Sequence, residues 1–236
     1  YSLMVIVVTG STRGIGKAIT ERFAADASII FITARNEKAL TEQESRLKSD
    51  YPDLVVRKFA ADLSKHDNVV AFARFVLDNC TAVDILVNNA GIFTPGNLLN
   101  EDEGNFDLVM ETNVRSIYTL CRMLVPKMIE ARKGHLFNIC SVAGLKAYPN
   151  GGSYSVSKFA LLGLTKNLRF ELAPHGVKAT AVIPGATWTD SWSNSGLPRS
   201  RFMEADDIAA MIYHISRLSP ACVVEEIVLR PQLGDI

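Results

Sequence analysis

Tyr154 and Lys158 lie four residues apart, a spacing that places two side chains on one face of a helix about one turn from each other. A phenol has a pKa of about 10, and a neighbouring ammonium group favours the ionised phenolate. Such a pair can exchange a proton with a substrate near neutral pH. The same spacing is common in surface contacts, so the pair alone is weak evidence for a proton donor.

Ser141 strengthens this interpretation. It directly follows a predicted strand at 135–140, and open α/β sheets bind ligands at the carboxyl ends of their strands. A hydroxyl group at that edge can hold a carbonyl oxygen beside the tyrosine. Ser141, Tyr154 and Lys158 together therefore predict proton transfer to a substrate carbonyl oxygen. The alternative is a strand-end cap next to a surface pair.

A glycine-rich loop, with Gly10, Gly14 and Gly16, joins a predicted strand at 3–9 to a predicted helix at 15–25. Free backbone N–H groups and the positive end of the helix dipole at such a turn bind a pyrophosphate. The same loop holds three further candidate contacts, Ser11, Arg13 and Ile15. Its spacing, G-x-x-x-G-x-G, differs from the common G-x-G-x-x-G, and three glycines can also form an ordinary turn. The position between a strand and a helix favours a dinucleotide site.

The end of the second predicted strand indicates which dinucleotide binds. An acidic residue there would hold the 2′-hydroxyl of NAD, but the chain has Arg35 instead. A guanidinium group binds a phosphate through two parallel hydrogen bonds, and Arg13 supplies a second cation. We therefore expect NADP(H) rather than NAD(H). The alternative is that both arginines are solvated surface charges.

Short apolar runs alternate with longer amphipathic stretches along the whole chain. The predicted strands span 3–9, 28–34, 54–60, 83–88, 135–140, 177–183 and 223–229, and the predicted helices span 15–25, 37–49, 65–79, 101–131, 154–173 and 206–218. Because parallel strands are covered by helices on both faces, this alternation predicts a doubly wound α/β fold with a seven-stranded parallel sheet, of the Rossmann type. No linker-like stretch divides the sequence, so we expect a single domain over 1–236.

The composition excludes several classes of protein. Lys plus Arg and Asp plus Glu both number 25, and this balance argues against nucleic acid as a partner. The longest apolar runs, 3–8 and 208–213, are far shorter than the about 20 residues that a membrane-spanning helix needs. The four cysteines form no C-x-x-C pair and the four histidines have no metal-ligand spacing, so we expect no metal site and a reducing, cytoplasmic location.

These motifs, in this order, resemble the short-chain dehydrogenase/reductase family over essentially the whole chain. The segment from Thr9 to Gly16 resembles the family's T-G-x-x-x-G-I-G loop. Further matches are Asp62 and Leu63 as an adenine-contact pair, Asn89, Ala90 and Gly91 in the N-N-A-G segment, Pro184, Gly185, Thr187 and Thr189 in the nicotinamide-side loop, and Asn113, Ser141, Tyr154 and Lys158 as the four active-site positions.

The resemblance implies a role for each active-site position. Tyr154 would donate a proton to the carbonyl oxygen as the nicotinamide delivers hydride, and Ser141 would hydrogen-bond that oxygen. Lys158 would lower the pKa of Tyr154 and hold the nicotinamide ribose. Asn113 would position a water molecule that links Lys158 to solvent. The implied activity is NADPH-dependent reduction of a carbonyl substrate to an alcohol.

The resemblance places the substrate lid at about 187–202, after the sixth strand. Trp188 and Trp192 lie in it, and two large rings there suggest closure over an apolar or aromatic substrate. Packing of the lid onto the domain is the alternative. The C-terminal segment resembles bacterial sepiapterin-reductase-like carbonyl reductases, which makes Asp235 a candidate contact for a pterin edge. A frayed terminal carboxylate is the alternative there.

Several alternatives share this sequence pattern. They are a 3-oxoacyl-carrier-protein reductase, an NAD-linked alcohol or sugar dehydrogenase, and a non-catalytic NADP(H)-sensing protein that binds partners according to redox state. The predicted helices 101–131 and 154–173 carry apolar residues on more than one face, and such helices need cover on two sides. Because family members commonly pair these helices, we expect a homodimer or homotetramer.

Overall fold

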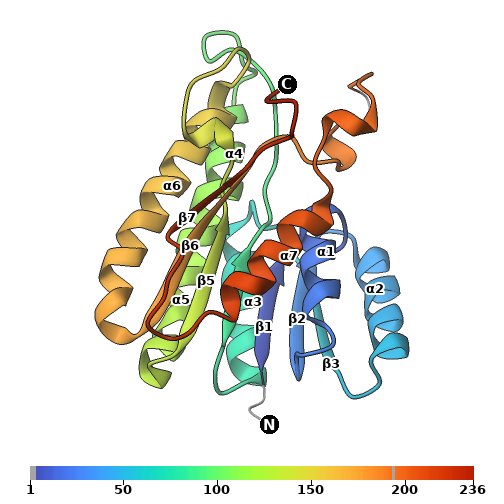
Figure 1. The fold of residues 1–236 in the computed structure, drawn as a ribbon, viewed down its shortest axis with the longest axis vertical. Coiled ribbons are helices and arrows are strands. Elements are labelled where there is room, and N and C mark those ends of the chain that lie inside the picture. Colours follow the sequence, from blue (N-terminus) through green and yellow to red (C-terminus); the bar gives the residue numbers. More distant parts are fainter. Residues whose placement is uncertain (1–3, 193–194) are drawn as a thin grey trace.

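A computed structural model of the chain describes residues 4–192 and 195–236. Seven strands form one parallel sheet in the order β3-β2-β1-β4-β5-β6-β7 (Figure 1). The strands are β1 Val5–Thr9, β2 Ile29–Ala34, β3 Val55–Ala60, β4 Ile85–Asn88, β5 Gly134–Ile139, β6 Val177–Pro184 and β7 Glu226–Leu229. Their carboxyl ends therefore all lie along one edge of the sheet. The predicted seven-stranded, doubly wound architecture is confirmed.

The sheet separates two apolar cores. Alternate residues of β1 point to opposite faces, so that Val5 and Val7 pack in one core while Ile6 and Val8 pack in the other. The first core is covered by α3 His66–Asn79, α5 Ser116–Ala131 and α6 Gly152–Leu172, and the second by α1 Gly14–Phe23, α2 Glu37–Asp50 and α7 Ala205–Ser216. Burial on both faces explains why most strands are apolar throughout.

The prediction of one continuous helix over 101–131 was wrong. Helix α4 covers only Asn105–Met110, and the π-helical turn Glu111–Arg115 separates it from α5. Within this turn the Ser116 N–H donates to the carbonyl of Glu111, five residues earlier. The extra residue in the turn changes the helical register, and a pattern of apolar residues does not reveal such a change.

Several predicted strands also begin later in the structure. Strand β4 begins at Ile85 and β7 at Glu226, although strands were predicted over 83–88 and 223–229. Leu3, the first residue of the first predicted strand, lies outside the described residues. In 4–192 and 195–236, no helix has the length and apolar character needed to span a membrane.

The strand order places a ligand-binding crevice. Strands β1 and β4 are neighbours in the sheet. The chain adds β2 and β3 on one side of β1, and then crosses to the other side, where it adds β4 to β7. In open α/β sheets, the carboxyl ends of the strands at such a reversal leave a crevice that binds ligands. The glycine-rich loop after β1 lies at this point, at the edge that is uppermost in Figure 1.

Candidate active site

The glycine-rich loop turns sharply from β1 into α1. Gly10 and Gly14 have φ angles of +63° and +51°, a region that glycine adopts without strain. A Cβ atom at Gly16 would collide with the Gly10 carbonyl and the Asn89 amide. The Nδ2 of Asn89 donates to the carbonyl oxygens of Thr9 and Gly10 at 2.9 and 3.0 Å. Asn89 thus fixes the loop shape, a role that the sequence did not predict.

A cavity of about 540 Å³, here called the larger cavity, opens beside this loop. Arg13 and Arg35 both line it, as the choice of NADP(H) requires. The predicted residues Gly10, Asp62, Leu63, Ala90 and Gly91 line it too, together with Thr12, Asn36 and Ser64, which the sequence did not single out. Asp62 accepts the Ser64 N–H at 3.0 Å, so this acidic side chain shapes the cavity wall.

Arg13 is in contact with the segment 187–202. Its guanidinium group pairs with Asp190 at 3.1 Å, and both side chains are exposed. An exposed ion pair of this kind contributes little to stability, and a phosphate can replace the carboxylate as its partner. The contact therefore leaves Arg13 available to the larger cavity.

The Ser11 side chain contacts another part of the protein. It is fully buried, and its hydroxyl donates to Oε1 of Gln43 in α2 at 3.1 Å. The Gln43 amide donates back to the Ser11 carbonyl at 2.8 Å. The Ser11 side chain therefore anchors the loop to α2, a pairing that cannot be read from residues so far apart in the sequence.

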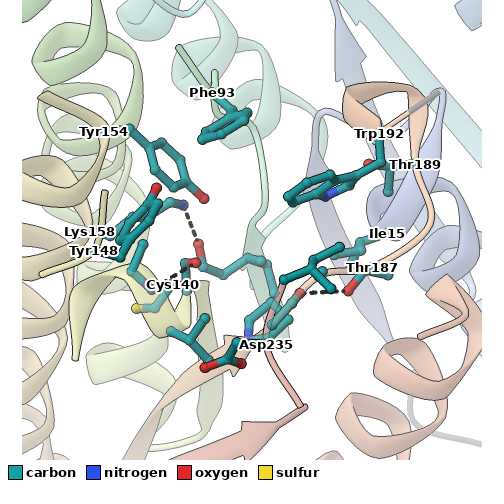
Figure 2. Close-up of a pocket in the computed structure, with 18 of the residues that line it drawn as sticks. Ile15, Phe93, Cys140, Tyr148, Tyr154, Lys158, Thr187, Thr189, Trp192 and Asp235 are labelled. Carbon is teal, nitrogen blue, oxygen red and sulfur yellow. Dashed lines mark hydrogen bonds between the residues drawn. The ribbon is translucent and has the colours of Figure 1, made fainter. Parts of the chain in front are cut away.

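A second cavity of about 340 Å³, here called the smaller cavity, holds the predicted catalytic side chains (Figure 2). Ser141, Tyr154 and Lys158 line it together. The predicted residues Ile15, Asn89, Pro184, Gly185, Thr187, Thr189, Trp192 and Asp235 also line it. Elements distant in the chain thus bring these groups to one place at the edge of the sheet.

Burial raises the pKa of Tyr154, while a hydrogen bond with Ser141 opposes that shift. The sequence predicted the opposite direction, because it showed the nearby lysine but not the burial of the phenol. A phenol with a raised pKa stays protonated at neutral pH. This state is the one that a proton donor requires.

Lys158 is only 6% exposed, and its Nζ donates to the carbonyl of Ile139 at 2.8 Å. The same atom lies 5.6 Å from the centroid of the Tyr154 ring. Burial lowers the pKa of Lys158 from 10.5 to about 8, and the nearby Cys140 opposes this shift. Lys158 therefore remains a cation at pH 7 next to the tyrosine.

The loop that carries Ser141 is packed onto α6. The Ser141 hydroxyl accepts the Ala143 N–H at 3.2 Å, which caps the short 3-10 helix Val142–Gly144. Ser155 of α6 donates to the carbonyl of Ala143 at 2.7 Å. A Cβ atom at Gly144 would lie 2.6 Å from the Lys158 carbonyl, so the loop approaches the helix as closely as glycine allows.

Asn113 is buried behind the cavity and does not line it. Its side chain accepts the Ile92 N–H at 2.8 Å and donates to the Ile92 carbonyl and the Ser157 hydroxyl, both at 3.0 Å. Ser157 in turn donates to the carbonyl of Tyr154 at 2.7 Å. Asn113 therefore joins the segment after β4 to the helix that carries the tyrosine.

Aromatic rings form one wall of the smaller cavity (Figure 2). The Phe93 ring meets Tyr154 edge-on at 4.8 Å between centroids and stacks with Trp192 at 6.1 Å. Tyr148 lines the cavity as well. Phe93 and Tyr148 were not predicted from the sequence, although Phe93 closely follows Asn89-Ala90-Gly91 and Tyr148 lies between Ser141 and Tyr154.

Trp188 does not belong to this wall. Among the described residues it packs against Phe202 at 5.1 Å and is not part of the cavity lining. The backbone N–H of Trp188 donates to the backbone carbonyl of Met203 at 2.8 Å. The prediction that both tryptophans face the substrate is thus wrong for Trp188, which packs its own segment. Residues 193–194 of the predicted lid lie outside the described residues.

Charged groups lie at the end of the smaller cavity away from Phe93. Asp235 pairs with Lys146 at 3.6 Å and also with Arg230. Asp235 and Lys146 line the cavity. The predicted carboxylate is therefore present at the cavity, but it already has two cationic partners.

The residues of the two cavities fit an extended dinucleotide. Both cavities are lined by Ile92, so together they lead from Arg35 to Tyr154 along the edge of the sheet. The glycines of the loop allow its close packing against Asn89 and Ala90, and such a turn before a helix can bind a pyrophosphate. The phenol of Tyr154 and the hydroxyl of Ser141 lie together in the smaller cavity, at the other end of this path from Arg35.

A sequence profile of the short chain dehydrogenases matches residues 4–199. The chain is 32% identical over 242 residues to a sepiapterin reductase from Chlorobaculum tepidum, and the match covers 98% of each chain. The protein belongs to the short chain dehydrogenase family. A 3-oxoacyl-[acyl-carrier-protein] reductase from Chlamydia muridarum is 34% identical over 184 residues, which are 78% of this chain and 74% of that one.

The solved structures include close matches to this short chain dehydrogenase. The crystal structure of a metagenomic short-chain oxidoreductase in complex with NADP matches with a TM-score of 0.84 and 32% identity, covering 98% of each chain. The family resemblance predicted from the motifs is confirmed, and the protein is an oxidoreductase.

Proposed function

We propose that this short chain dehydrogenase reduces a carbonyl compound to an alcohol with NADPH, and that Tyr154 is the proton donor. The observation that carries the proposal is the placement of Tyr154 beside Ser141 and Lys158 in the lining of the smaller cavity. Reduction needs a protonated donor, whereas alcohol oxidation would begin with a phenolate. A protonated Tyr154 can act as this donor at neutral pH.

Bound NADPH supplies the hydride that reaches the carbonyl carbon. Ser141 and Tyr154 hydrogen-bond the carbonyl oxygen, on which negative charge develops. The Tyr154 proton then moves to that oxygen, which completes the alcohol and leaves a phenolate. The Lys158 ammonium stabilises this phenolate and can hold the ribose of the cofactor. Asn113 acts behind them, because its bond to Ser157 supports the helix.

The cofactor preference rests on two cations at the larger cavity. Arg35 follows β2 where NAD-dependent proteins carry an acid, and Arg13 lines the same cavity. A 2′-phosphate can bind both guanidinium groups and displace Asp190 from Arg13. The metagenomic relative that was crystallised with NADP supports this choice.

The substrate we propose is a ketone or diketone that carries a flat ring, as sepiapterin does. The rings of Phe93 and Trp192 are stacked, and Tyr148 adds a third ring to the cavity lining. The similarity to a sepiapterin reductase supports the same class. A pterin edge at Asp235 would have to compete with Lys146 and Arg230. The segment 187–202 serves as the lid through Trp192.

We also propose that the protein pairs with a second copy through α4, α5 and α6. These helices expose large apolar side chains, among them Phe106, Tyr118, Phe159 and Phe170, the last with 82% of its surface exposed. Exposed apolar side chains of this size are typical of a subunit interface. Light scattering on the purified protein should give the mass of a dimer or tetramer, and a monomeric mass would contradict this arrangement.

The proposed activity is tested by following NADPH absorbance with sepiapterin, aromatic ketones, small diketones and a 3-oxoacyl thioester. We expect turnover of ring-bearing ketones, and NADPH binding at least about tenfold tighter than NADH binding because of the charged 2′-phosphate. Arg35→Ala should remove most of that preference, whereas Arg74→Ala, an exposed change on α3, should not. Tight NADPH binding without turnover of any carbonyl would instead favour the redox sensor.

A further inference from the structure

Glu101 lies in the loop between β4 and α4 and binds the start of the catalytic helix α6. One carboxylate oxygen accepts the Ser153 N–H at 2.6 Å, and the other accepts the Ser153 hydroxyl. The second oxygen also accepts an N–H of the Asn105 amide at 3.0 Å. Asn105 is the first residue of α4, so one carboxylate joins the beginnings of two helices, which lie side by side in Figure 1.

Within 4–192 and 195–236, no other side chain caps the start of helix α6 in this way. Its N-cap residue Gly151 makes no side-chain hydrogen bond, and the first turn of α6 itself contains no acidic residue. The first N–H groups of a helix lack partners within the helix, and a negative charge there is stabilising. Glu101 meets both needs from 52 residues away.

The glycine at the start of α6 leaves the space that this carboxylate occupies. Gly152 has a φ of +46°, and a Cβ atom there would collide with Oε1 of Glu101. A second contact holds the same loop, because the Gly96 N–H donates to the Asn150 carbonyl at 3.0 Å. The position of the loop against α6 is therefore fixed on both sides of the helix start.

The contact lies directly next to the proton donor. Ser153 is fully buried and immediately precedes Tyr154. The loop that carries Glu101 also carries Phe93, whose ring packs on Tyr154 at 4.8 Å. A change in the Glu101 contact would thus move both the backbone that holds the phenol and the ring that limits its rotation.

We propose that Glu101 is a positioning residue for the reaction, which holds Tyr154 at the carbonyl oxygen through Ser153. This inference rests on the proposed role of Tyr154 as proton donor. Glu101 does not touch the substrate and exchanges no proton with it. Its hydrogen bonds with Ser153 lower the pKa of the carboxyl group, so Glu101 is ionised throughout the neutral pH range.

The test compares Glu101→Gln with Glu103→Gln, an exposed glutamate in the same loop. A glutamine keeps the size of the side chain but loses its charge and one acceptor. We expect Glu101→Gln to lower kcat about tenfold at a temperature where the variant is fully folded, with the KM for substrate and the Kd for NADPH within twofold. The solvent deuterium isotope effect on kcat should rise, because a displaced phenol makes proton transfer slower. Glu103→Gln should change none of these values.

A double-mutant cycle with Ser153→Ala tests the route of the effect. If Glu101 acts through Ser153, the double variant should be no slower than the slower single variant. A Glu101→Gln protein that melts earlier but keeps its kcat and isotope effect would overturn the proposal and leave Glu101 a helix cap alone. Loss of activity in Tyr154→Phe, measured alongside, shows that such a result concerns Glu101, whereas an active Tyr154→Phe would overturn the proposed function itself.

Discussion

Replacing Tyr154 with phenylalanine is expected to lower kcat by about 1000-fold, because the change removes the group that protonates the carbonyl oxygen. The ring and its edge-on contact with Phe93 at 4.8 Å are retained, so the cavity keeps its shape. The Kd for NADPH should stay within a few-fold, since the larger cavity is untouched. Steady-state kinetics and a fluorescence titration with NADPH measure the two quantities.

Tyr51→Phe is the matched control for this variant. Tyr51 follows α2 and lines neither cavity among the described residues, so loss of its hydroxyl should leave kcat unchanged. If Tyr154→Phe kept a kcat within about tenfold of the wild type, another group would have to supply the proton, and the proposed mechanism would be wrong.

Replacing Lys158 with methionine is expected to stabilise the protein while it lowers kcat by roughly 100-fold. Burial lowers the pKa of Lys158 to about 8, so the folded protein carries the full cost of a buried ammonium below that pH. A pKa shift of this size corresponds to a cost of about 3 kcal/mol in the free energy of unfolding. Loss of the hydrogen bond to the Ile139 carbonyl offsets roughly 1 kcal/mol of the stability that the substitution gains. The melting temperature at pH 7 should therefore rise by roughly 5 °C.

The stability difference between Lys158→Met and the wild type should depend on pH. Between about pH 8 and 10.5 the unfolded chain binds more protons at this lysine than the folded protein does, so the stability of the wild type rises with pH. The difference in melting temperature between Lys158→Met and the wild type should shrink across that interval. Lys166→Met, on the same helix but exposed and paired with Glu226, is the control and should change neither property greatly. A Lys158→Met protein less stable at every pH would contradict the account.

Features set by local sequence could be predicted. A run such as Ile29–Ala34 is long enough for one buried strand, and its flanking polar residues mark its ends. The glycine spacing after β1 likewise predicted the turn, because only a few chain conformations bring backbone that close to a ligand. The order of Ser141, Tyr154 and Lys158 predicted one site, since the ends of parallel strands and the helices that follow them meet at one edge.

Features set by tertiary contact could not be predicted. Trp188 and Trp192 lie in the same irregular segment and both pack on Phe202, but of the two Trp192 alone lines the smaller cavity. The contact of Glu101 with Ser153 joins residues 52 positions apart. The pKa of Tyr154 is raised by burial and lowered by a hydrogen bond with Ser141, and both effects depend on the folded structure.

The most direct test uses NADPH that carries deuterium at the transferred position of the nicotinamide C4, with an aromatic ketone as substrate and mass spectrometry of the product. The proposed function predicts that the wild type forms an alcohol with one deuterium on the carbinol carbon, and that Tyr154→Phe forms almost none. An alcohol without deuterium, or tight NADPH binding with no alcohol from any ketone tested, would contradict direct hydride transfer to a carbonyl at this site.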